Sequence, residues 1–328
     1  MPRTLIIYNP TAGRARRAID EVRAVISAMD SAAYEIYETT GPGTATTRTR
    51  AALSEGYTTI AAVGGDGTLG ETATGFFDLD NLDDKGWPAP VNPRAVFAPL
   101  PAGTGNDFTR ALANGRPEPL SYWLHGLTAY LQGSGRTRLV DALYGTTDGG
   151  TQRFVALNMV TLGLSVAVIR RVRAQGTLLQ QLPGGVRFVW AALGALAAWR
   201  EQPVSVTLDD NAPRRFATNL LTFANSPYAG GGMMFAPNAQ LDDSWLDALL
   251  SGGLSRAGIL RELPRIRHGG HVANPKVTIR QARRVSVTAP DDTPFYIEAD
   301  SNLLGQTPLT LRVMPGTLQV VCESHYIR

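Results

Sequence analysis

Apolar and polar positions alternate between two patterns along the first 140 residues. Short apolar or β-branched runs predict strands, and segments with an apolar residue every three or four positions predict helices between them. The predicted strands cover residues 4–9, 34–39, 58–63 and 95–100, and the predicted helices cover residues 14–29, 44–56 and 68–77. Strands that alternate with helices pair in parallel through right-handed crossovers, so a layered α/β sheet is expected here.

The pattern changes near Leu139, where short β-rich runs replace the alternation. These runs are separated by clusters of Pro, Gly, Asn and Asp, which is typical of antiparallel strands joined by turns. The predicted strands cover residues 153–160, 203–210, 219–226, 276–290, 294–300, 309–315 and 318–324, and a helical segment over 186–200 interrupts them. A second domain of mostly antiparallel strands is therefore expected from Leu139 onward.

The composition fits globular domains and excludes several classes of protein. The chain has 328 residues, of which 44% are hydrophobic and 18% are charged, so two domains can each bury a core. Cys322 is the only cysteine, which excludes an intrachain disulfide and a thiolate zinc site. The net charge is only +3 and no basic run is interleaved with aromatic residues, so no nucleic-acid partner is expected.

No segment of the sequence predicts export or a membrane span. The apolar part of the amino terminus is too short for a signal peptide. The longest apolar run, residues 188–199, is shorter than the ~20 residues that cross a bilayer. We therefore expect a soluble, cytoplasmic protein.

Two further features have a structural interpretation and a functional one. One face of the helix over 186–200 is expected to be core, and its members are Trp190, Leu193, Leu196 and Ala197. The alternative is an exposed apolar stripe, flanked by Arg187 and Arg200, that contacts a bilayer surface. His268 and His271 lack the spacing and the glutamate of a zinc protease, so a solvated loop is expected there.

Polar loops rich in glycine follow the predicted strands of the α/β part. They read NPTAG (residues 9–13), TTGPGT (39–44), GGDGT (64–68) and PAGTGND (101–107). Ligands of parallel sheets bind beyond the carboxyl ends of the strands, so these loops are expected to meet at one sheet edge. Backbone N–H groups of glycine-rich turns bind phosphate without a basic side chain, although tight turns alone would also explain the glycines.

Several phosphate-binding mechanisms are excluded by the motifs that are missing. The sequence has no G-x-x-x-x-G-K-[ST] motif, and neither Lys85 nor Lys276 lies in a Val-Ala-Ile-Lys context, which excludes P-loop and protein-kinase mechanisms. NPTAG stands where a dehydrogenase would have G-x-G-x-x-G, so hydride transfer is not expected.

Three of these loops carry a family resemblance, together with a later segment. In these segments the chain resembles the bacterial diacylglycerol-kinase-like lipid kinases, relatives of the sphingosine kinases. The segments are NPTAG, GGDGTLGE, PAGTGNDFTR and NSPYAGGGMMFAPNAQLDDSW (residues 225–245). The resemblance extends over essentially the whole chain. GGDGT alone is shared with NAD kinases, whereas GTGNDF and the GGG segment at these spacings are more specific.

The resemblance implies a fold and an activity. It implies an α/β nucleotide-binding domain over residues 1–138 and an antiparallel β-sandwich over 139–328 that holds the lipid, with a last strand that returns to the first domain. The implied reaction transfers the γ-phosphate of ATP, with Mg²⁺, to a hydroxyl of diacylglycerol or a related lipid at the cleft between the domains. The implied partners are ATP and a lipid at a membrane surface, with peripheral association at the inner membrane face; the oligomeric state and the lipid stay open.

The resemblance also assigns site residues. The ATP-contacting positions are Asn9, Pro10, Thr11, Ala12, Gly13, Thr39, Gly64, Gly65, Gly67, Thr68, Leu69, Gly70, Glu71, Gly103, Thr104, Gly105, Asn106 and Asp107. Asp66 matches the carboxylate that arranges the catalytic Mg²⁺, and Asp107 helps to hold that network. Mg²⁺ prefers hard oxygen ligands, which agrees with both assignments, while helix capping is the alternative for both.

A second Mg²⁺, with a structural role, is implied in the AQLDDSW segment. The matching ligands are the Asp243 side chain and the backbone carbonyls of Gln240 and Trp245. A plain acidic turn is the alternative interpretation.

The chain departs from the family pattern near the end of the second domain. The family carries Asp-Gly-Glu, whose acidic residues act as the base on the lipid hydroxyl, and this sequence has Asp300, Ser301 and Asn302. Asn302 cannot accept a proton at neutral pH. Either Asp300 suffices, because phosphoryl transfer depends mainly on positioning, or the protein binds lipid or nucleotide as an inactive regulator. Glu298 shares a strand face with Asp300 and would substitute only if the site shifts.

An NAD kinase and a kinase for a non-lipid alcohol also stay open as functions.

Overall fold

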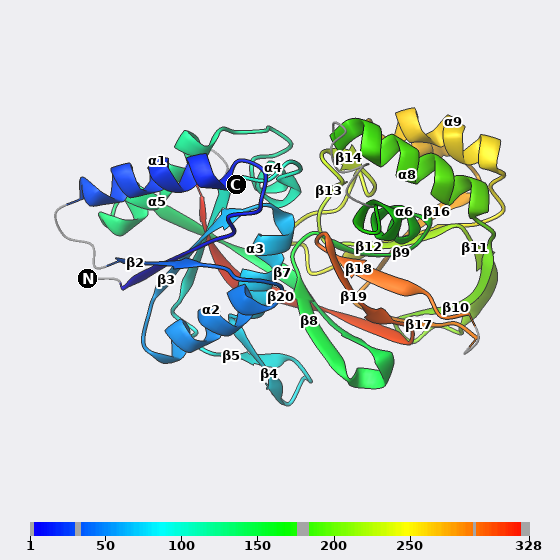
Figure 1. Ribbon diagram of the computed structural model, residues 1–328. Coiled ribbons are helices and arrows are strands. Elements are labelled where there is room, and N and C mark those ends of the chain that lie inside the picture. Colours follow the sequence, from blue (N-terminus) through cyan, green and yellow to red (C-terminus); the bar gives the residue numbers. More distant parts are fainter. Residues whose placement is uncertain (1–2, 30–33, 176–183, 291–292, 323–328) are drawn as a thin grey trace.

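The protein folds into two lobes that lie side by side (Figure 1). The computed structural model describes residues 3–29, 34–175, 184–290 and 293–322. The first lobe comprises the chain up to residue 133, and the second lobe comprises residues 148–306. Two long strands, β7 (Arg136–Thr147) and β20 (Leu309–Cys322), run through both lobes.

The first lobe is built on a parallel sheet, as the alternating pattern predicts. Its strand order is β2-β1-β3-β6, and each neighbouring pair is parallel. The strands are β1 (Thr4–Tyr8), β2 (Tyr34–Glu38), β3 (Thr59–Gly64) and β6 (Val96–Pro101). The helices are α1 (Ala15–Ser27), α2 (Thr44–Ser54), α3 (Asp66–Thr74), α4 (Asp107–Leu112) and α5 (Leu120–Leu131). All residues of β1, β3 and β6 are buried, because helices cover both faces of the sheet (Figure 1).

The predicted helix over 68–77 differs from the observed one at both ends. Helix α3 begins at Asp66 and ends before Gly75, and Phe77 already belongs to a strand. That strand, β4 (Phe77–Leu82), forms an unpredicted hairpin with β5 (Pro88–Pro90). The helix stops here because Phe76 and Phe77 pack into the core of the lobe, where both are almost fully buried.

The second lobe is an antiparallel β-sandwich, as expected. One sheet has the order β16-β15-β12-β9-β18-β19, and the other contains β11-β10-β17-β20 with β7 and β8. Their facing side chains form one apolar core, which includes Leu143, Val160, Phe223, Val287 and Leu311. The strands are β8 (Gln152–Ala156), β9 (Met159–Gly163), β10 (Gln202–Leu208), β11 (Arg214–Thr218), β12 (Leu220–Ala224), β15 (Leu246–Ser251), β16 (Val277–Ala282), β17 (Arg284–Thr288), β18 (Tyr296–Ala299) and β19 (Asn302–Gln306), with a small hairpin of β13 (Tyr228–Ala229) and β14 (Met233–Met234).

Strand β20 connects the two lobes. It pairs with β17 near its start, runs antiparallel along β7, and lies parallel to β6 where Val320 is opposite Phe97. The separate strands predicted over 309–315 and 318–324 are therefore one strand, with a register shift at Pro315 and Gly316; residues 323 and 324 lie outside the described part. The division proposed between residues 138 and 139 falls within β7.

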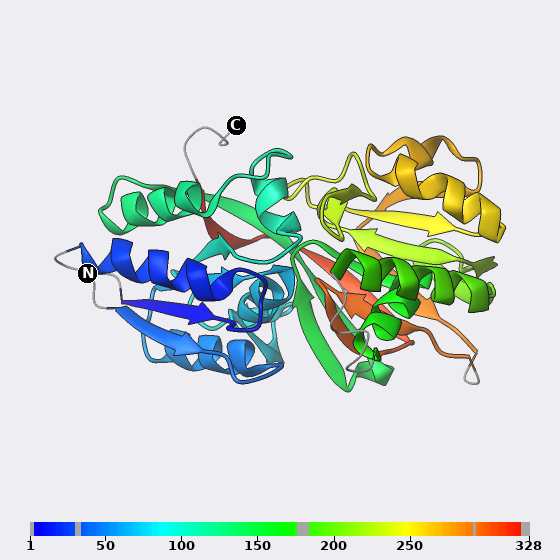
Figure 2. The same ribbon diagram turned by 45° about the horizontal axis from the view of Figure 1, so that its top comes forward.

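The second lobe also carries helices α6 (Leu164–Arg173), α8 (Gly184–Ala198) and α9 (Arg256–Ile266). Helix α6 contacts β9 and β18, and α8 packs on α6 as the outermost layer (Figure 2). The prediction that one face of the helix over 186–200 is core is wrong for Trp190 and Leu193, which are 66% and 52% exposed. Ala197 is also exposed and only Leu196 is buried, because α8 contacts the protein through its alanines. The Arg187 side chain lies outside the described part of the chain.

The prediction of a solvated His268–His271 loop is half correct. His268 is exposed, but His271 is 2% exposed in a short 3₁₀ turn, Gly270–Ala273, where its ring bonds to the Phe235 carbonyl. Burial lowers the pKa of His271 below its ordinary value. Within the described ranges, no helix is both long enough and apolar enough to cross a bilayer.

Candidate functional site

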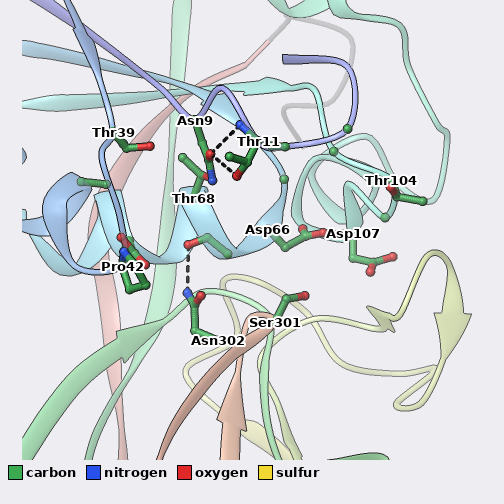
Figure 3. A pocket seen from close by; sticks show the side chains of 18 of the residues that line it. Asn9, Thr11, Thr39, Pro42, Asp66, Thr68, Thr104, Asp107, Ser301 and Asn302 are labelled. Atoms are coloured by element: carbon green, nitrogen blue, oxygen red, sulfur yellow. Dashed lines mark hydrogen bonds between the residues drawn. The ribbon is translucent and has the colours of Figure 1, made fainter. Parts of the chain in front are cut away.

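The glycine-rich loops of the first lobe meet at a cavity of about 570 Å³ between the two lobes. The turn over residues 39–42 forms one wall, and the loops after β1, β3 and β6 form others. Gly230, Gly231, Ser301 and Asn302 of the second lobe close the cavity from the opposite side (Figure 3). The cavity lies beyond the carboxyl ends of the parallel strands, which is where parallel sheets bind their ligands.

Most residues that the family pattern assigns to ATP lie in this cavity. Those that line it are Asn9, Thr11, Ala12, Gly13, Thr39, Gly65, Gly67, Thr68, Glu71, Gly103, Thr104, Gly105 and Asp107. Those that do not line it are Pro10, Gly64, Leu69, Gly70 and Asn106. Leu69 is fully buried in the core, and Gly70 lies against Asp300. Leu69 and Gly70 belong to α3, and the turn of this helix directs them away from the cavity.

Side-chain hydrogen bonds hold the loop after β1 in shape. Asn9 Oδ1 accepts from the backbone N–H of Thr11 at 3.0 Å and from its hydroxyl at 2.7 Å. Asn9 Nδ2 donates to Thr68 Oγ1 at 3.3 Å, which ties this loop to the start of α3 (Figure 3). The loop therefore keeps a fixed shape beside the cavity.

The loops after β3 and β6 touch at Gly65 and Gly103. A Cβ on Gly103 would clash with the Gly65 backbone, so this contact requires glycine. We predict that Gly103→Ala lowers the free energy of unfolding by about 1–3 kcal/mol, because overpacking forces the backbones apart. The same variant should weaken nucleotide binding.

Gly41→Ala is the matched control for Gly103→Ala. Gly41 lines the same cavity, but no atom lies within 4 Å of the position that a Cβ would take there. Melting temperature and nucleotide titration measure both effects. If Gly41→Ala changed the melting temperature and the nucleotide affinity as much as Gly103→Ala, the packing argument would be wrong.

Asp66 and Asp107 are the buried carboxylates of the cavity. Asp66 Oδ1 accepts from Phe108 N–H at 2.9 Å and from Asn158 Nδ2 at 3.2 Å. Asp107 accepts from the N–H groups of Gly231 at 2.9 Å and Gly232 at 2.6 Å, which belong to the other lobe. Burial, and next the Asp66 charge, raise the pKa of Asp107 to about 6. Neither residue caps its own helix, although Asp66 accepts from the first turn of α4.

The two carboxylates are suited to a hard divalent cation. The Oδ2 atoms of Asp66 and Asp107 each lie 3.0 Å from the position that a Cβ on Gly105 would take, so a glycine leaves space between them. In the described part of the chain, no three His, Cys, Asp or Glu side chains gather as a complete metal site. A pair of carboxylates is a ligand set that Mg²⁺ uses, since this ion binds through one or two carboxylates and completes its shell with water and phosphate oxygens.

Asp300 lies behind the cavity and does not line it. Its carboxylate accepts from three successive N–H groups, those of Leu157 at 2.5 Å, Asn158 at 2.9 Å and Met159 at 3.2 Å. Burial raises its pKa to about 7, against the effect of these N–H donors. Asp300 therefore holds the connection between β8 and β9, and only 5% of the residue is exposed.

The turn after Asp300 does reach the cavity. Ser301 and Asn302 line it, and Asn302 Nδ2 donates to the Gly67 carbonyl at 2.9 Å across the lobes (Figure 3). Ser301 has a φ of 70°, in the left-handed region where glycine is favoured. Glu298 is buried and bonds to the Thr161 hydroxyl at 2.7 Å and to Ser301 N–H, so it does not take the place of the missing acid.

Asn158 belongs to the site and was not predicted. Its amide donates to Asp66, its Oδ1 accepts from the Ser226 hydroxyl at 2.9 Å, and its N–H bonds to Asp300. It thus connects the carboxylate of the first lobe to that of the second. The signal in the sequence was an asparagine inside the apolar run FVALNMV, which was predicted as one strand and is two.

The predicted structural metal ligands lie outside the cavity. Asp243 Oδ1 accepts from Trp245 N–H at 3.0 Å, and neighbouring Asp247 is buried with Oδ2 lacking a hydrogen-bond partner. Burial, and next the Asp243 charge, raise the pKa of Asp247 to about 6. Asp141, also close by, accepts from Ser244 N–H at 2.6 Å. Asp141 and Asp247 were not predicted at this loop.

Two protein families match this chain. The family described as "Diacylglycerol kinase catalytic domain" matches residues 3–133, and "YegS C-terminal NAD kinase beta sandwich-like domain" matches residues 158–322. The chain belongs to the diacylglycerol-kinase-like lipid kinase family. The loops around the cavity fall within the first matched region, and Asn158, Gly231 and Asn302 fall within the second.

Members of this lipid kinase family align with nearly the full chain. The diacylglycerol kinase of Mycobacterium tuberculosis is 25% identical over 321 residues, which cover 97% of this chain and 94% of that protein. The diacylglycerol kinase of Bacillus subtilis is 26% identical over 303 residues, 92% of this chain and 90% of that protein. A solved diacylglycerol kinase structure from Bacillus anthracis has a TM-score of 0.66 at 18% identity, covers 99% of this chain and 98% of that one, and so shares the fold.

Proposed function

We propose that this protein transfers the γ-phosphate of ATP, with Mg²⁺, to a hydroxyl of diacylglycerol or a related lipid. The observation that carries the proposal is the cavity between the lobes, where the glycine-rich loops of one lobe face Ser301 and Asn302 of the other. A nucleotide held by the first lobe would then present its last phosphate to an acceptor held by the second. Membership of a lipid kinase family supports a kinase over a binding protein of another class.

The loops of the first lobe supply the contacts for the phosphates. Backbone N–H groups near Gly65 and Gly103 bind anions without a basic side chain, which this cavity needs because neither lysine of the chain lines it. Asp66 and Asp107 would hold Mg²⁺, which when bound neutralises charge on the phosphates. The hydrogen bonds from Phe108 and Asn158 fix the Asp66 carboxylate so that its Oδ2 stays accessible to a cation.

The acceptor side of the cavity differs from the family pattern, and this shapes the proposed mechanism. Asn302 is neutral, and Asp300 is committed to three backbone N–H groups. We propose that catalysis relies on positioning and charge stabilisation, with Asp300 holding Asn158 and the turn in place. Phosphoryl transfer through a loose transition state depends mainly on these two effects.

NAD phosphorylation is the second candidate function. The family matched by residues 158–322 is described as NAD kinase β-sandwich-like, and GGDGT is shared with NAD kinases. Under this alternative the acceptor would be a ribose hydroxyl instead of a lipid hydroxyl.

A single assay separates these functions. ATP consumption is measured with dispersed diacylglycerol, with other lipids that carry a free hydroxyl, with NAD, and without acceptor. We expect turnover with one or more lipids and none above background with NAD. Turnover with NAD alone would establish the second candidate, and ATP binding with no turnover on any acceptor would favour an inactive regulator.

We also propose a structural Mg²⁺ at the Asp243 loop, bound by the Asp243 side chain and the carbonyls of Gln240 and Trp245. The unpartnered Asp247 oxygen and the neighbouring Asp141 support it, because a cation would offset the repulsion among these carboxylates. We predict that Mg²⁺ raises the melting temperature of the wild type and that Asp243→Ala abolishes the shift.

Asp242→Ala is the matched control for the structural Mg²⁺. Asp242 lies in the same loop but is exposed and bonds to Arg138. It should keep the full Mg²⁺-dependent shift. If Mg²⁺ raised the melting temperature of Asp243→Ala as much as that of the wild type, the proposed structural Mg²⁺ site would be wrong.

A further inference from the structure

The outward face of α8 exposes large apolar side chains. Val189, Trp190 and Leu193 are 56%, 66% and 52% exposed. At 3.6 residues per turn, these side chains and Ala197 fall within one stripe along the helix. The opposite face buries Ala191 and Ala195 against Val168 of α6. The helix therefore contacts the protein with small residues and exposes its large apolar residues on the other face.

Arginines of α6 and of the segment after α8 border this stripe. Arg170, Arg171 and Arg173 of α6 are exposed, as is Arg200 just beyond α8. The Arg171 guanidinium lies beside α8, with Nη1 3.3 Å from the position of a Cβ on Gly194. The sequence from 164 to 200 contains no aspartate or glutamate, and Glu201, which follows Arg200, accepts hydrogen bonds from Asn219 and Gly253. The α6/α8 surface thus combines an apolar stripe with a net positive charge.

We propose that the α6/α8 surface, formed by Val189, Trp190, Leu193 and Ala197 with the arginines of α6 and Arg200, docks on an anionic lipid bilayer. Tryptophan favours the interface between water and hydrocarbon, and an apolar helix face bordered by arginine binds anionic lipid surfaces. A second copy of the chain is a poorer occupant, because a two-fold contact would bring the same arginines against one another.

Docking here would place the cavity near the lipid surface. Arg173, at the end of α6, donates to the Ser301 carbonyl at 2.8 Å, and Ser301 lines the cavity. The docking surface is thus one hydrogen bond away from the turn that closes the cavity on its acceptor side. This part of the inference rests on the proposed lipid kinase function, whereas the docking itself does not.

Binding to vesicles tests the docking without ATP or an acceptor lipid. The full chain is sedimented with vesicles of phosphatidylcholine, alone or mixed with phosphatidylglycerol. We expect binding to the mixed vesicles. The double variant Trp190→Ser/Leu193→Ser should bind at least roughly tenfold more weakly, because the apolar contact is lost. Arg171→Gln/Arg200→Gln should lower the affinity for mixed vesicles about twenty-fivefold, since each arginine near an anionic surface contributes about fivefold.

Matched variants elsewhere on the surface control for polarity and charge. Leu82 and Leu139 are 43% and 57% exposed on β4 and β7, so Leu82→Ser/Leu139→Ser changes exposed apolar residues of the first lobe and its shared strand. Arg16→Gln/Arg215→Gln removes two exposed arginines from α1 and β11. Both controls should bind vesicles like the wild type, and all four variants should keep the wild-type melting temperature.

Fluorescence gives a second readout of the same contact. The chain has five tryptophans, so the contribution of Trp190 is isolated by comparing the wild type with Trp190→Phe. Mixed vesicles should shift the wild-type emission to the blue, and Trp190→Phe should remove most of that shift. A shift of the same size in Trp190→Phe would overturn the placement of this residue in the bilayer.

Three outcomes would overturn the docking proposal. They are absence of wild-type binding to mixed vesicles, equal loss in the control variants, and conversion of a wild-type dimer to a monomer by Trp190→Ser/Leu193→Ser. Kinase assays on detergent-dispersed lipid are run in parallel. Turnover of detergent-dispersed lipid without binding to vesicles would reject the docking surface but not the proposed function. Binding to vesicles without turnover would reject the proposed function but not the docking surface.

Discussion

Replacing Asp66 by asparagine is expected to lower kcat by a factor on the order of 10²–10³, or more if the metal is lost with the charge. The asparagine oxygen keeps an acceptor for Phe108 N–H and Asn158 Nδ2, so the two hydrogen bonds that hold this side chain survive. What disappears is the negative charge beside Asp107 in the cavity. The measurement is steady-state kinetics on whichever acceptor the wild type phosphorylates.

The stability of the Asp66→Asn variant shows whether the loss is catalytic. Its melting temperature should stay close to that of the wild type, because the geometry of the α4 start is retained. Asp20→Asn is the matched control, since it makes the same change on the exposed face of α1 and should leave kcat unaltered. Near-normal kcat in Asp66→Asn would show that Asp66 serves only to hold the start of α4.

Local patterns predicted the first lobe better than the second. Its strands are short apolar runs between amphipathic helices, and β1, β3 and β6 match the predicted ranges within two residues. Strand β20 was predicted as two strands because Pro315 and Gly316 usually end a strand. Pairing with β7 on both sides of the register shift keeps it continuous, and no local pattern reports that pairing.

The loops of the site were predictable, and the contacts behind them were not. Glycines after consecutive strands indicate where backbones approach a ligand, and Gly65, Gly103 and Gly105 all line the cavity. Leu69 was assigned to ATP only because it lies inside a matching motif, and the helical turn directs it into the core. The Asp300 contacts join residues more than 140 positions apart, so its role in holding Asn158 follows only from the folded chain.

The turn Asp300–Asn302 provides the second large effect. Asp300→Ala would leave three buried N–H groups without an acceptor, and each costs about 1–3 kcal/mol. We therefore expect that variant to be strongly destabilised, so that its loss of activity would not identify a base. The informative change is at Ser301 and Asn302, where the chain departs from its family and the cavity is accessible.

Restoring the family pattern with Ser301→Gly and Asn302→Glu together is expected to raise the rate of lipid phosphorylation. The glutamate would add a carboxylate to the cavity lining, and a positioned general base contributes ~10²–10⁴-fold. Glycine at 301 suits a φ of 70°, which should offset the loss of the hydrogen bond that Asn302 donates to Gly67. Ser301→Gly alone separates the backbone effect from the charge, and Asn302→Gln keeps the position neutral.

The pattern of rates in these variants distinguishes the remaining functions. A wild type that turns over at an ordinary kinase rate, with no gain in the double variant, would contradict the predicted gain and support positioning alone as the source of the full rate. A silent wild type with an active double variant would identify a lipid-binding relative that lost catalysis through this turn. If neither turns over while both bind ATP, the acceptor is not a lipid, and the proposed role of the second lobe is wrong. Asn302 donates a hydrogen bond across the lobes to the Gly67 carbonyl, so its replacement can also change how the lobes close. ATP affinity is therefore measured in each variant, which separates a change in lobe closure from a change in chemistry.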